Sequence, residues 1–437
     1  MKINIPQLAL VILIGPSGSG KTSFAKKHFQ STSILSSDFF RGMISDDEND
    51  QTVTGEAFEI LDFIAQNRLK KGKLTIIDST NVLKAARQPL LKFAKSYHIL
   101  PIAIVFNFSE KTCQDRNQLR FDRQVDPFII HRQHYQLQNS LIEIVNEGFH
   151  KIYYINDDTS VDEIHVELEP LACDRHLIEG PFDIIGDIHG CYDELIVLLE
   201  KLGYQQHLIA SPIFQEYNLF YKHPTNRKVI FIGDVVNYGP KILETISLIS
   251  NMVHEGNAYC ILGDHERFLL NWFKSCGKNC HSSLKKTLQA FESIPIGIHY
   301  LYMQYIQQFL EQLSYHYLFD HGNLIVSHAG MLQNMQGRIS KAVNHFCLYG
   351  ENISEPQLGI VPSYQPEWPA KHSGDARIVY GHIPVEKPQW FNRTVNIDTG
   401  CVFGGALTAL QYPEKKFISI KANKPYYEID ELTNLIT

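Results

Sequence analysis

Short apolar runs alternate with longer segments of helical periodicity over the first 160 residues of the chain. The runs that indicate strands are residues 8–14, 33–36, 74–77, 102–108 and 151–155. The segments with apolar residues at helical spacing are residues 21–29, 56–70, 85–97 and 128–147. This alternation predicts an α/β fold in which a parallel sheet carries helices on both faces.

A polar, acidic stretch at residues 156–169 is followed by a new set of apolar runs that begins near residue 171. The change in pattern predicts two domains, 1–170 and 171–437. The second domain combines strand candidates that end in Asp and His with a helical, aromatic-rich stretch at residues 267–317. We interpret that stretch as an insert that packs on the core of the second domain.

The amino-acid composition and the net charge indicate which class of protein this is. Hydrophobic residues make up 44% of the 437 residues and charged residues 20%, which is typical of a globular protein with substantial cores. The formal net charge of −7 argues against a continuous basic surface, so any contact with nucleic acid would be local. This favours binding to chain ends over binding to duplex.

No segment resembles a signal peptide, and the apolar run at residues 8–14 is far shorter than the roughly 20 residues that span a bilayer. We therefore expect a cytoplasmic protein without membrane contact, whose eight cysteines are reduced. Cys276, Cys280 and His281 have a spacing seen in metal sites, but no second pair stands nearby. We interpret them as surface or packing residues.

The segment Gly15-Pro16-Ser17-Gly18-Ser19-Gly20-Lys21-Thr22 matches the phosphate-loop (P-loop) pattern and lies between a predicted strand and a predicted helix. Backbone N–H groups of such a loop bind phosphate, and the helix N-terminus adds positive potential. Lys21 would reach the β- and γ-phosphates of ATP, and Thr22 would hold Mg²⁺. The predicted ATP-binding residues are Gly15, Ser17, Gly18, Ser19, Gly20, Lys21 and Thr22. The first domain is therefore predicted to be a P-loop kinase.

Asp38 and Arg41 follow the second predicted strand, three residues apart. A carboxylate there would orient and deprotonate an acceptor hydroxyl, and the arginine would bind a phosphate on the acceptor. Asp78, at the end of the third predicted strand, would assist Mg²⁺ or acceptor binding. The alternative for Asp38 and Arg41 is a helix cap followed by a solvated arginine.

Arg116, Arg120 and Arg123 lie within about two helical turns of one another. Arginines that fold over a nucleotide neutralise charge on the transferring phosphoryl group and exclude water. We therefore predict that they form a catalytic lid. A solvated basic helix face is the alternative.

Five clusters of Asp and His follow apolar runs in the second half of the chain. They are Asp187 with His189, Asp234, Asp264 with His265, His328, and His382. Carboxylates and imidazoles at successive strand ends supply ligands for two adjacent divalent ions. The sequence therefore predicts a dinuclear metal centre.

The runs GPSGSGKTSFAKKHF, LSSDFFRGMISDDENDQTVTG and CQDRNQLRFDRQ resemble the kinase module of bacterial polynucleotide kinase-phosphatases. The resemblance spans most of residues 1–160 and implies that the acceptor is a 5′-hydroxyl end of RNA or DNA. The residues that match family positions are Lys21, Thr22, Asp38, Arg41, Arg116, Arg120 and Arg123. A small-metabolite kinase is the alternative acceptor class.

The order of the Asp and His clusters resembles that of calcineurin-like binuclear phosphoesterases, and VNIDTGCVFGGALTAL at residues 395–410 resembles the end of the phosphatase module in the same bacterial family. The resemblance implies an α/β metallophosphoesterase sandwich with a helical insert and two Mn²⁺ or Ni²⁺ ions. It implies that the first ion is held by Asp187 and His189, that Asp234 bridges, and that the second ion is held by Asp264, His328 and His382. His265 would stand beside the leaving group while a metal-activated water attacks a phosphate ester.

Three positions depart from the pattern of that family, whose members carry Asn where Asp264 stands and Asp-Arg where Asn237-Tyr238 stand. An ionised Asp264 adds negative charge facing the substrate, whereas Asn would offer an N–H donor. Tyr238 lacks the bidentate phosphate donor that Arg provides. We therefore expect the phosphoesterase to be attenuated, retuned to a different ester, or inactive.

Together these resemblances predict an end-healing enzyme that phosphorylates 5′-OH ends and removes 2′ or 3′ terminal phosphate. A separate ligase is expected to act downstream, because the chain ends soon after the phosphatase signature, and homo-oligomerisation is compatible with the sequence. One alternative is a dinucleotide polyphosphate or protein phosphatase with an accessory nucleotide-binding or small-metabolite kinase domain. Another is a nucleotide-dependent sensor of nucleic-acid ends.

Overall fold

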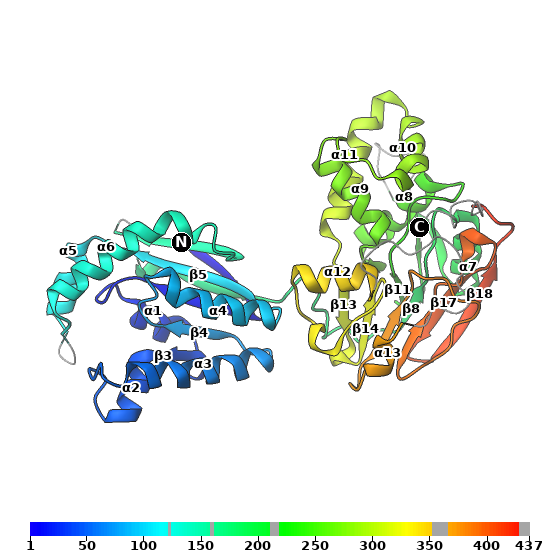
Figure 1. Ribbon diagram of the computed structural model, residues 1–437. Helices are drawn as coiled ribbons and strands as arrows, with labels where there is room; N and C mark the ends of the chain where they lie inside the picture. The colour runs from blue at the N-terminus through cyan, green and yellow to red at the C-terminus, as the bar shows by residue number, and fades with distance from the viewer. Residues whose placement is uncertain (121–123, 158–160, 210–217, 352–365, 428–437) are drawn as a thin grey trace, which may run out of the picture. The chain divides into compact units, whose positions relative to one another are not determined.

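The computed structural model describes residues 1–120, 124–157, 161–209, 218–351 and 366–427, and the chain divides into two units (Figure 1). Unit 1 comprises Met1–Leu171 with Arg338–Ser340, and unit 2 comprises Ala172–Gly337 with Lys341–Thr437. The first segment of unit 1 ends at Leu171.

Unit 1 is built on a five-stranded sheet in the order β3-β4-β2-β5-β6, in which all neighbouring strands are parallel. The strands are β2 (Ala9–Ile14), β3 (Ile34–Ser36), β4 (Thr75–Asp78), β5 (Leu100–Asn107) and β6 (Lys151–Asn156). Every residue of the central strand β2 is buried, and its side chains alternate between two core clusters. A strand buried on both faces requires that both faces of the sheet be covered.

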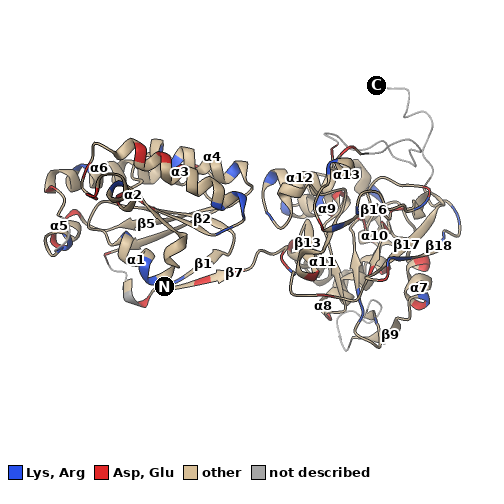
Figure 2. Ribbon diagram, turned by 90° about the horizontal axis from the view of Figure 1, so that it is seen from below, with Lys and Arg blue, Asp and Glu red and all other residues tan. Residues whose placement is uncertain are grey.

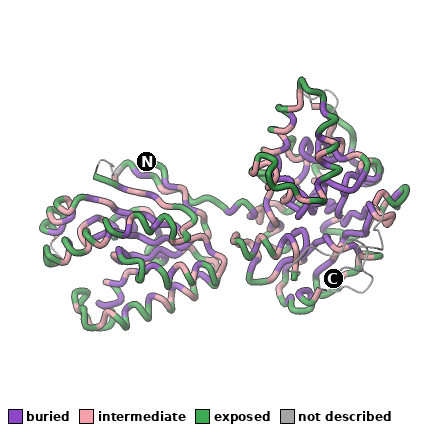
Figure 3. Tube along the Cα trace, turned by 45° about the horizontal axis from the view of Figure 1, so that its top comes forward, coloured by how far each residue is buried: buried purple, intermediate pink, exposed green. Residues whose placement is uncertain are grey.

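Helices cover the two faces of this sheet. They are α1 (Lys21–His28), α2 (Ser37–Ser45), α3 (Thr54–Lys70), α4 (Lys84–Ser96), α5 (Glu110–Gln118) and α6 (Pro127–Ile144). Phe24 of α1 packs in one cluster with Val11, and Leu61 of α3 packs in the other with Ile12. The burial view shows the strands as the buried layer and the outer surfaces of the helices as exposed (Figure 3). The predicted parallel sheet with helices on both faces is confirmed.

The structure also contains elements that the apolar pattern did not reveal. β1 (Lys2–Pro6) pairs in parallel with β7 (His165–Glu169), so the polar stretch at residues 156–169 contains a strand. β7 is mostly exposed, and its sequence HVELE alternates polar and apolar residues, so the signal for this strand lies in the alternation and not in an apolar run. Helix α2 begins directly after β3, which places Asp38 in its first turn.

Unit 2 packs a five-stranded sheet, in the order β12-β11-β8-β17-β18, against a four-stranded sheet in the order β13-β14-β15-β16. The first contains β8 (Phe182–Ile185), β11 (Lys228–Phe231), β12 (Ala258–Cys260), β17 (Ala406–Tyr412) and β18 (Lys416–Lys421). The second contains β13 (His316–Phe319), β14 (Leu324–Ser327), β15 (Arg377–Tyr380) and β16 (Thr394–Asn396). One core cluster joins Ile184 and Ile230 of the first sheet to Val326 and Val379 of the second, which confirms the sandwich.

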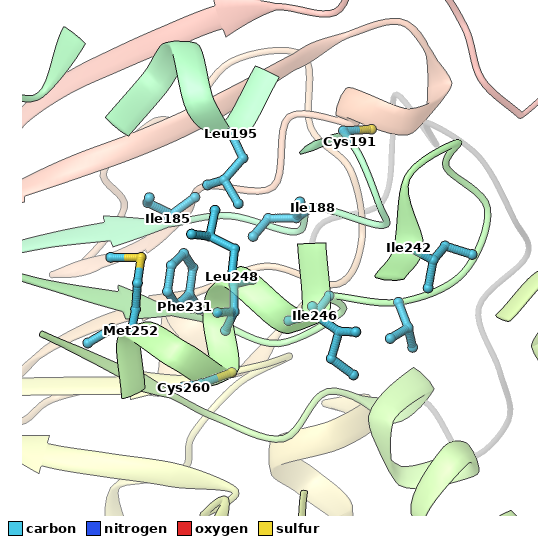
Figure 4. Close-up of a cluster of buried hydrophobic side chains, with 14 of the residues drawn as sticks. Ile185, Ile188, Cys191, Leu195, Phe231, Ile242, Ile246, Leu248, Met252 and Cys260 are labelled. Atoms are coloured by element: carbon cyan, nitrogen blue, oxygen red, sulfur yellow. The ribbon is translucent and has the colours of Figure 1, made fainter. Parts of the chain in front are cut away.

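Helices flank the sandwich. The helices α7 (Tyr192–Lys201) and α8 (Ile242–His254) contribute Leu195 and Ile246 to the cluster that contains Ile185 and Phe231 of the first sheet (Figure 4). The segment with α9 (Asp264–Lys274), α10 (Lys285–Glu292) and α11 (Ile296–Gln312) adds Phe291 and Ile306 to this cluster. The predicted helical insert therefore packs on the core. The helices α12 (Lys341–Tyr349) and α13 (Trp368–Lys371) pack with Ile325 and Ile378 of the second sheet.

Charged residues of both signs are interspersed along the elements of each unit (Figure 2). All eight cysteines are free, and Cys276 and Cys280 are the exposed ones. Within the described ranges, no helix has both the length and the apolar character needed to cross a bilayer.

Candidate functional site

The phosphate loop connects β2 to α1 and depends on its glycines. Gly18 and Gly20 have φ values of 79° and 93°, in the left-handed region that favours glycine. A Cβ atom on Gly18 would lie 2.2 Å from the carbonyl oxygen of Cys113, so no side chain fits there. The N–H of Gly15 donates to the carbonyl of Thr80 at 2.9 Å, which fixes the start of the loop.

Lys21 is buried at the beginning of α1, and its Nζ donates to the carbonyls of Gly15 and Pro16, each at 2.8 Å. Burial lowers the pKa of Lys21 to about 8, although the charge of Asp78 opposes this shift. The predicted ATP-binding residues 17–22 line a cavity of about 740 Å³. A triphosphate bound in this cavity would offer Lys21 anionic oxygens in place of neutral carbonyls.

Asp38, Arg41 and Asp78, predicted to act on the acceptor or on Mg²⁺, line the same cavity. Arg116 and Arg120 of the predicted lid line it as well. Arg41 is buried, pairs with Asp38 and donates through Nε to the carbonyl of Glu48 at 3.0 Å. Burial raises the pKa of Asp78, and the charge of Lys21 opposes this shift.

Arg116, near the end of α5, reaches the phosphate loop. Its guanidinium lies 4.3 Å from the ring centre of Phe108 and donates to the carbonyl of Ser19 at 3.3 Å. Arg123, predicted to belong to the same lid, lies outside the described residues. Lid closure by these arginines stays a prediction.

The predicted metal ligands follow strands of both sheets in unit 2. Asp187 and His189 follow β8, Asp234 follows β11, Asp264 begins α9 after β12, His328 follows β14, and His382 follows β15. Each of these residues is more than nine-tenths buried. Parallel strands bring their carboxyl ends to one edge of a sheet, so residues distant in sequence converge there.

The donor atoms form two groups that share Asp234. The groups are Asp234, Asp264, His328 and His382, and His189, Asp234 and His265, with the donor atoms of each group within 4.8 Å of one another. His328 Nε2 lies 3.5 Å from one oxygen of Asp234, and His189 Nε2 lies 3.5 Å from the other. This arrangement places Asp234 where a bridging ligand would stand.

Asp187 belongs to neither group, so its role as a ligand stays a prediction. Its Oδ2 accepts the backbone N–H of His382 at 3.0 Å. Its Oδ1 is buried and has no hydrogen-bond partner among the described residues. A buried carboxylate oxygen without a partner is costly, and a cation ligand would satisfy it.

Two of the imidazoles are oriented as metal ligands. His189 Nδ1 donates to the carbonyl of Val236 at 3.0 Å, and His328 Nδ1 donates to the carbonyl of Ile232 at 2.9 Å. When neutral, both rings therefore keep Nε2 unprotonated and facing Asp234. Carboxylate and imidazole donors suit divalent ions such as Mn²⁺ and Ni²⁺, so these residues fit a cation pair.

Charge repulsion within the centre also favours cations. Burial raises the pKa values of Asp187 and Asp234. The negative charge of Asp398 raises the pKa of Asp187 further, and the negative charge of Asp264 raises the pKa of Asp234 further. Burial alone would lower the pKa of His328, but its hydrogen bond to Asp264 and the charge of Asp187 raise it to about 9. Divalent cations would relieve the repulsion and displace that proton.

Two buried carboxylates at the centre had no role in the sequence analysis. Glu266 accepts hydrogen bonds from the N–H groups of Asp234 at 2.7 Å and of Val235 at 2.9 Å. Asp398 lies beside Asp187, and burial raises its pKa to about 6. Glu266 directly follows Asp264 and His265, and Asp398 stands within VNIDTGCVFGGALTAL, but the sequence does not indicate which way these two side chains point.

The departures at Asn237 and Tyr238 shape the environment of His265. Asn237 Nδ2 donates to His265 Nδ1 at 2.5 Å, and Thr287 donates its hydroxyl to Asn237 Oδ1, which sets the amide orientation. His265 therefore carries its proton on Nε2, 3.9 Å from Asp234 Oδ2, and burial lowers its pKa to about 4. The ring of Tyr238 lies about 5 Å from those of His189 and His265 and occupies the position where the family pattern has arginine.

The chain is similar to known proteins over both units. The AAA domain family matches residues 10–143, and the calcineurin-like phosphoesterase family matches residues 180–414. The proteins named bis(5′-nucleosyl)-tetraphosphatase PrpE (asymmetrical) from Geobacillus sp. (strain WCH70) and Halalkalibacterium halodurans are 37% and 38% identical to this chain over 244 residues. Each match covers 56% of this chain and 95% of the relative. The protein of the same name from Geobacillus thermodenitrificans is 38% identical over the same length.

The lowered pKa of Lys21 predicts that ATP binding weakens above about pH 8. Phosphate oxygens raise the pKa of a bound lysine, so the neutral amine must take up a proton when ATP binds. The dissociation constant for ATP should then rise by up to about tenfold per pH unit between pH 8 and the pKa that Lys21 has in the ATP complex. Calorimetric titration with ATP·Mg²⁺ at several pH values measures this dependence. Lys21→Arg, which stays charged throughout, should show little change, and an equally flat profile for the wild type would contradict the prediction.

Replacing His328 by Ala should lower the number of bound divalent ions by one, because its Nε2 lies 3.2 Å from Asp264 and 3.5 Å from Asp234 in one donor group. Metal content after dialysis against Mn²⁺ measures this loss. His316 is equally buried on the neighbouring strand β13 but outside the donor groups, so His316→Ala is the matched control and should keep the metal content of the wild type. Unchanged metal content in His328→Ala would show that this histidine is not a ligand.

Proposed function

The chain belongs to the calcineurin-like phosphoesterase family, with a kinase-like AAA domain ahead of the phosphoesterase, and from this premise we propose that unit 2 hydrolyses bis(5′-nucleosyl) polyphosphates. The observation that carries this proposal is the buried carboxylate of Asp234, which two donor groups share. Relatives at 37% and 38% identity, covered over 95% of their length, are named bis(5′-nucleosyl)-tetraphosphatases. Their name supports this substrate class over a terminal phosphomonoester.

The residues of the centre have distinct roles in this proposal. When bound, two divalent ions would supply Lewis-acid charge to the phosphate and lower the pKa of a water molecule. Asp234, Asp264, His189, His328 and His382 would hold the ions. His265 keeps a proton on Nε2 because Asn237 donates to its Nδ1, so the neutral ring would donate a hydrogen bond to the oxygen that leaves the phosphate chain and keep its proton.

Two of the departures from the family pattern also favour an internal phosphate as substrate. A terminal phosphomonoester carries close to two negative charges at neutral pH, whereas each internal phosphate of a dinucleotide carries one. Asp264 adds a carboxylate, and Tyr238 offers an aromatic ring where an arginine would bind the dianion. Both changes weaken the binding of a phosphate dianion more than the binding of a singly charged phosphate.

The full chain with Mn²⁺ should hydrolyse a bis(5′-nucleosyl) tetraphosphate to a nucleoside triphosphate and a nucleoside monophosphate. Separation of the products by anion-exchange chromatography measures the rate. Asp234→Asn should lower kcat by more than ~100-fold, because it weakens the ligand common to both cation sites. Asp193→Asn, which alters an exposed carboxylate on α7, is the control and should keep the wild-type rate. Faster hydrolysis of an oligonucleotide 2′- or 3′-phosphate than of the dinucleotide would favour end healing instead.

For unit 1 we propose transfer of the γ-phosphoryl group of ATP to a hydroxyl, with the 5′-OH end of RNA or DNA as the acceptor. The supporting observation is that the buried Arg41, paired with Asp38, lines the same cavity as Lys21. Asp38 would accept the hydroxyl proton, and Arg41 would bind an acceptor phosphate. Unit 1 would then add phosphate at nucleic-acid ends, while unit 2 acts on free dinucleotides.

Incubation with labelled ATP·Mg²⁺ and 5′-OH oligonucleotides should yield labelled 5′ ends. Asp38→Asn should lower this rate by about 10²- to 10⁴-fold, the usual contribution of a general base. Glu59→Gln, an exposed change on α3 outside the cavity, should have no effect. Labelling of a sugar or nucleoside but never of an oligonucleotide would assign unit 1 to small-metabolite kinases.

A further inference from the structure

A second cavity in unit 2, of about 630 Å³, adjoins the metal centre. Its lining includes Gly381 and His382, and His382 belongs to one of the donor groups. A Cβ atom on Gly381 would lie 2.4 Å from Asp187 Oδ1, so the wall of the cavity touches the centre directly. A molecule whose phosphate reaches the centre would therefore be able to extend into this cavity.

The cavity has the size and chemistry of a site for a small polar molecule with an aromatic part. Sites for such ligands usually measure about 300–1,000 Å³ and combine aromatic side chains with a few polar groups. The aromatic side chains of Tyr349 and Phe391 line this cavity, as do Glu351, Glu386 and Lys387. This combination matches a nucleoside, which has a flat base, hydroxyl donors and an adjacent phosphate.

Phe391 stands on a turn with a well-anchored backbone, and the residue is 57% exposed. It pairs with Thr394 through two backbone hydrogen bonds of 2.9 and 2.8 Å across a two-residue turn. The turn residues Asn392 and Arg393 have φ values of 45° and 63°, as a tight hairpin turn requires. Asn392 anchors the turn by donating to the carbonyl of Pro369 at 2.8 Å. An exposed aromatic ring on a well-anchored turn is suited to stacking with a nucleobase.

The charged residues of the lining favour a nucleoside over a second phosphate group. Glu351 and Glu386 would repel phosphate, but they would accept hydrogen bonds from ribose hydroxyls or from an exocyclic amine. Lys387 supplies a cation for the phosphate next to that nucleoside. The polyphosphate chain would then lie toward the metal centre and the nucleoside in the cavity.

We propose that this cavity binds one nucleoside of a bis(5′-nucleosyl) polyphosphate, with the base stacked on Phe391 and the adjacent phosphate beside Lys387. The inference rests on the proposed function of unit 2 and assigns to it a specificity site outside the metal centre. The second nucleoside lies outside this cavity.

The test compares two substrates of the full chain in Mn²⁺, a bis(5′-nucleosyl) tetraphosphate and p-nitrophenyl phosphate, which lacks a nucleoside. Phe391→Ala should lower the ratio of their kcat/KM values by about tenfold, through a higher KM for the dinucleotide. Phe391→Trp should restore the ratio, because it keeps a ring for stacking. Lys387→Ala should lower the ratio in the same direction. Tyr300→Ala removes an exposed aromatic ring from α11, outside the cavity, and should leave the ratio unchanged.

The outcomes separate this inference from the function on which it rests. If the wild type hydrolyses the dinucleotide but Phe391→Ala and Lys387→Ala keep the ratio within about twofold, the cavity does not bind a nucleoside and the proposed function stands. If the wild type hydrolyses p-nitrophenyl phosphate but not the dinucleotide, the proposed function is wrong, and the assignment of the cavity is wrong with it.

Discussion

The two donor groups that share Asp234 depend on the buried carboxylate of Glu266. Besides Asp234 and Val235, this carboxylate accepts the N–H groups of Val236 at 3.1 Å and Gly263 at 3.2 Å, so it ties the loop after β11 to the start of α9. Asp234 has a φ of 48°, a left-handed conformation that costs on the order of 1–3 kcal/mol in a residue other than glycine. Hydrogen bonds to a charged acceptor contribute about 1.5–3 kcal/mol each and offset this strain. Glu266 thus holds the carboxylate of Asp234 between the two donor groups.

The two units bury charge of opposite sign for the same physical reason. In unit 1 a lysine is enclosed by backbone carbonyls, and in unit 2 several carboxylates are enclosed together, so each site is unfavourable until a ligand of opposite charge binds. The triphosphate of ATP complements the first site, and a pair of divalent cations complements the second. Strained backbone occurs in the second site, where His189 and His382 also have positive φ values. Such strain persists where the surrounding hydrogen bonds determine the conformation.

Asn237 and Tyr238 belong to neither donor group, but both lie beside His265 and set the chemistry around it. An aspartate at position 237 would be able to accept a proton from His265 Nδ1, whereas the amide donates to that atom and keeps the ring neutral. Tyr238 packs against Tyr427, with ring centres 4.5 Å apart, and adds apolar surface where a charged clamp would stand. Both residues reduce the positive charge that a phosphate dianion would meet, in keeping with the dinucleotide substrate proposed for unit 2.

Features that depend on neighbouring residues can be predicted from the amino-acid sequence. The apolar strand, the glycines and Lys21 of the phosphate loop follow one another directly, and the Asp and His residues at strand ends follow from the alternation of apolar runs and polar ends. The folded chain was needed to show that Asp234 joins two donor groups while Asp187 stands beside them, and that Glu266 supports the loop after β11. It was also needed to show that β1 pairs with β7, although Lys2 and its partner His165 lie far apart in the chain. Contacts of this kind depend on long-range packing and on the direction of buried side chains, which the local pattern of apolar and polar residues does not specify.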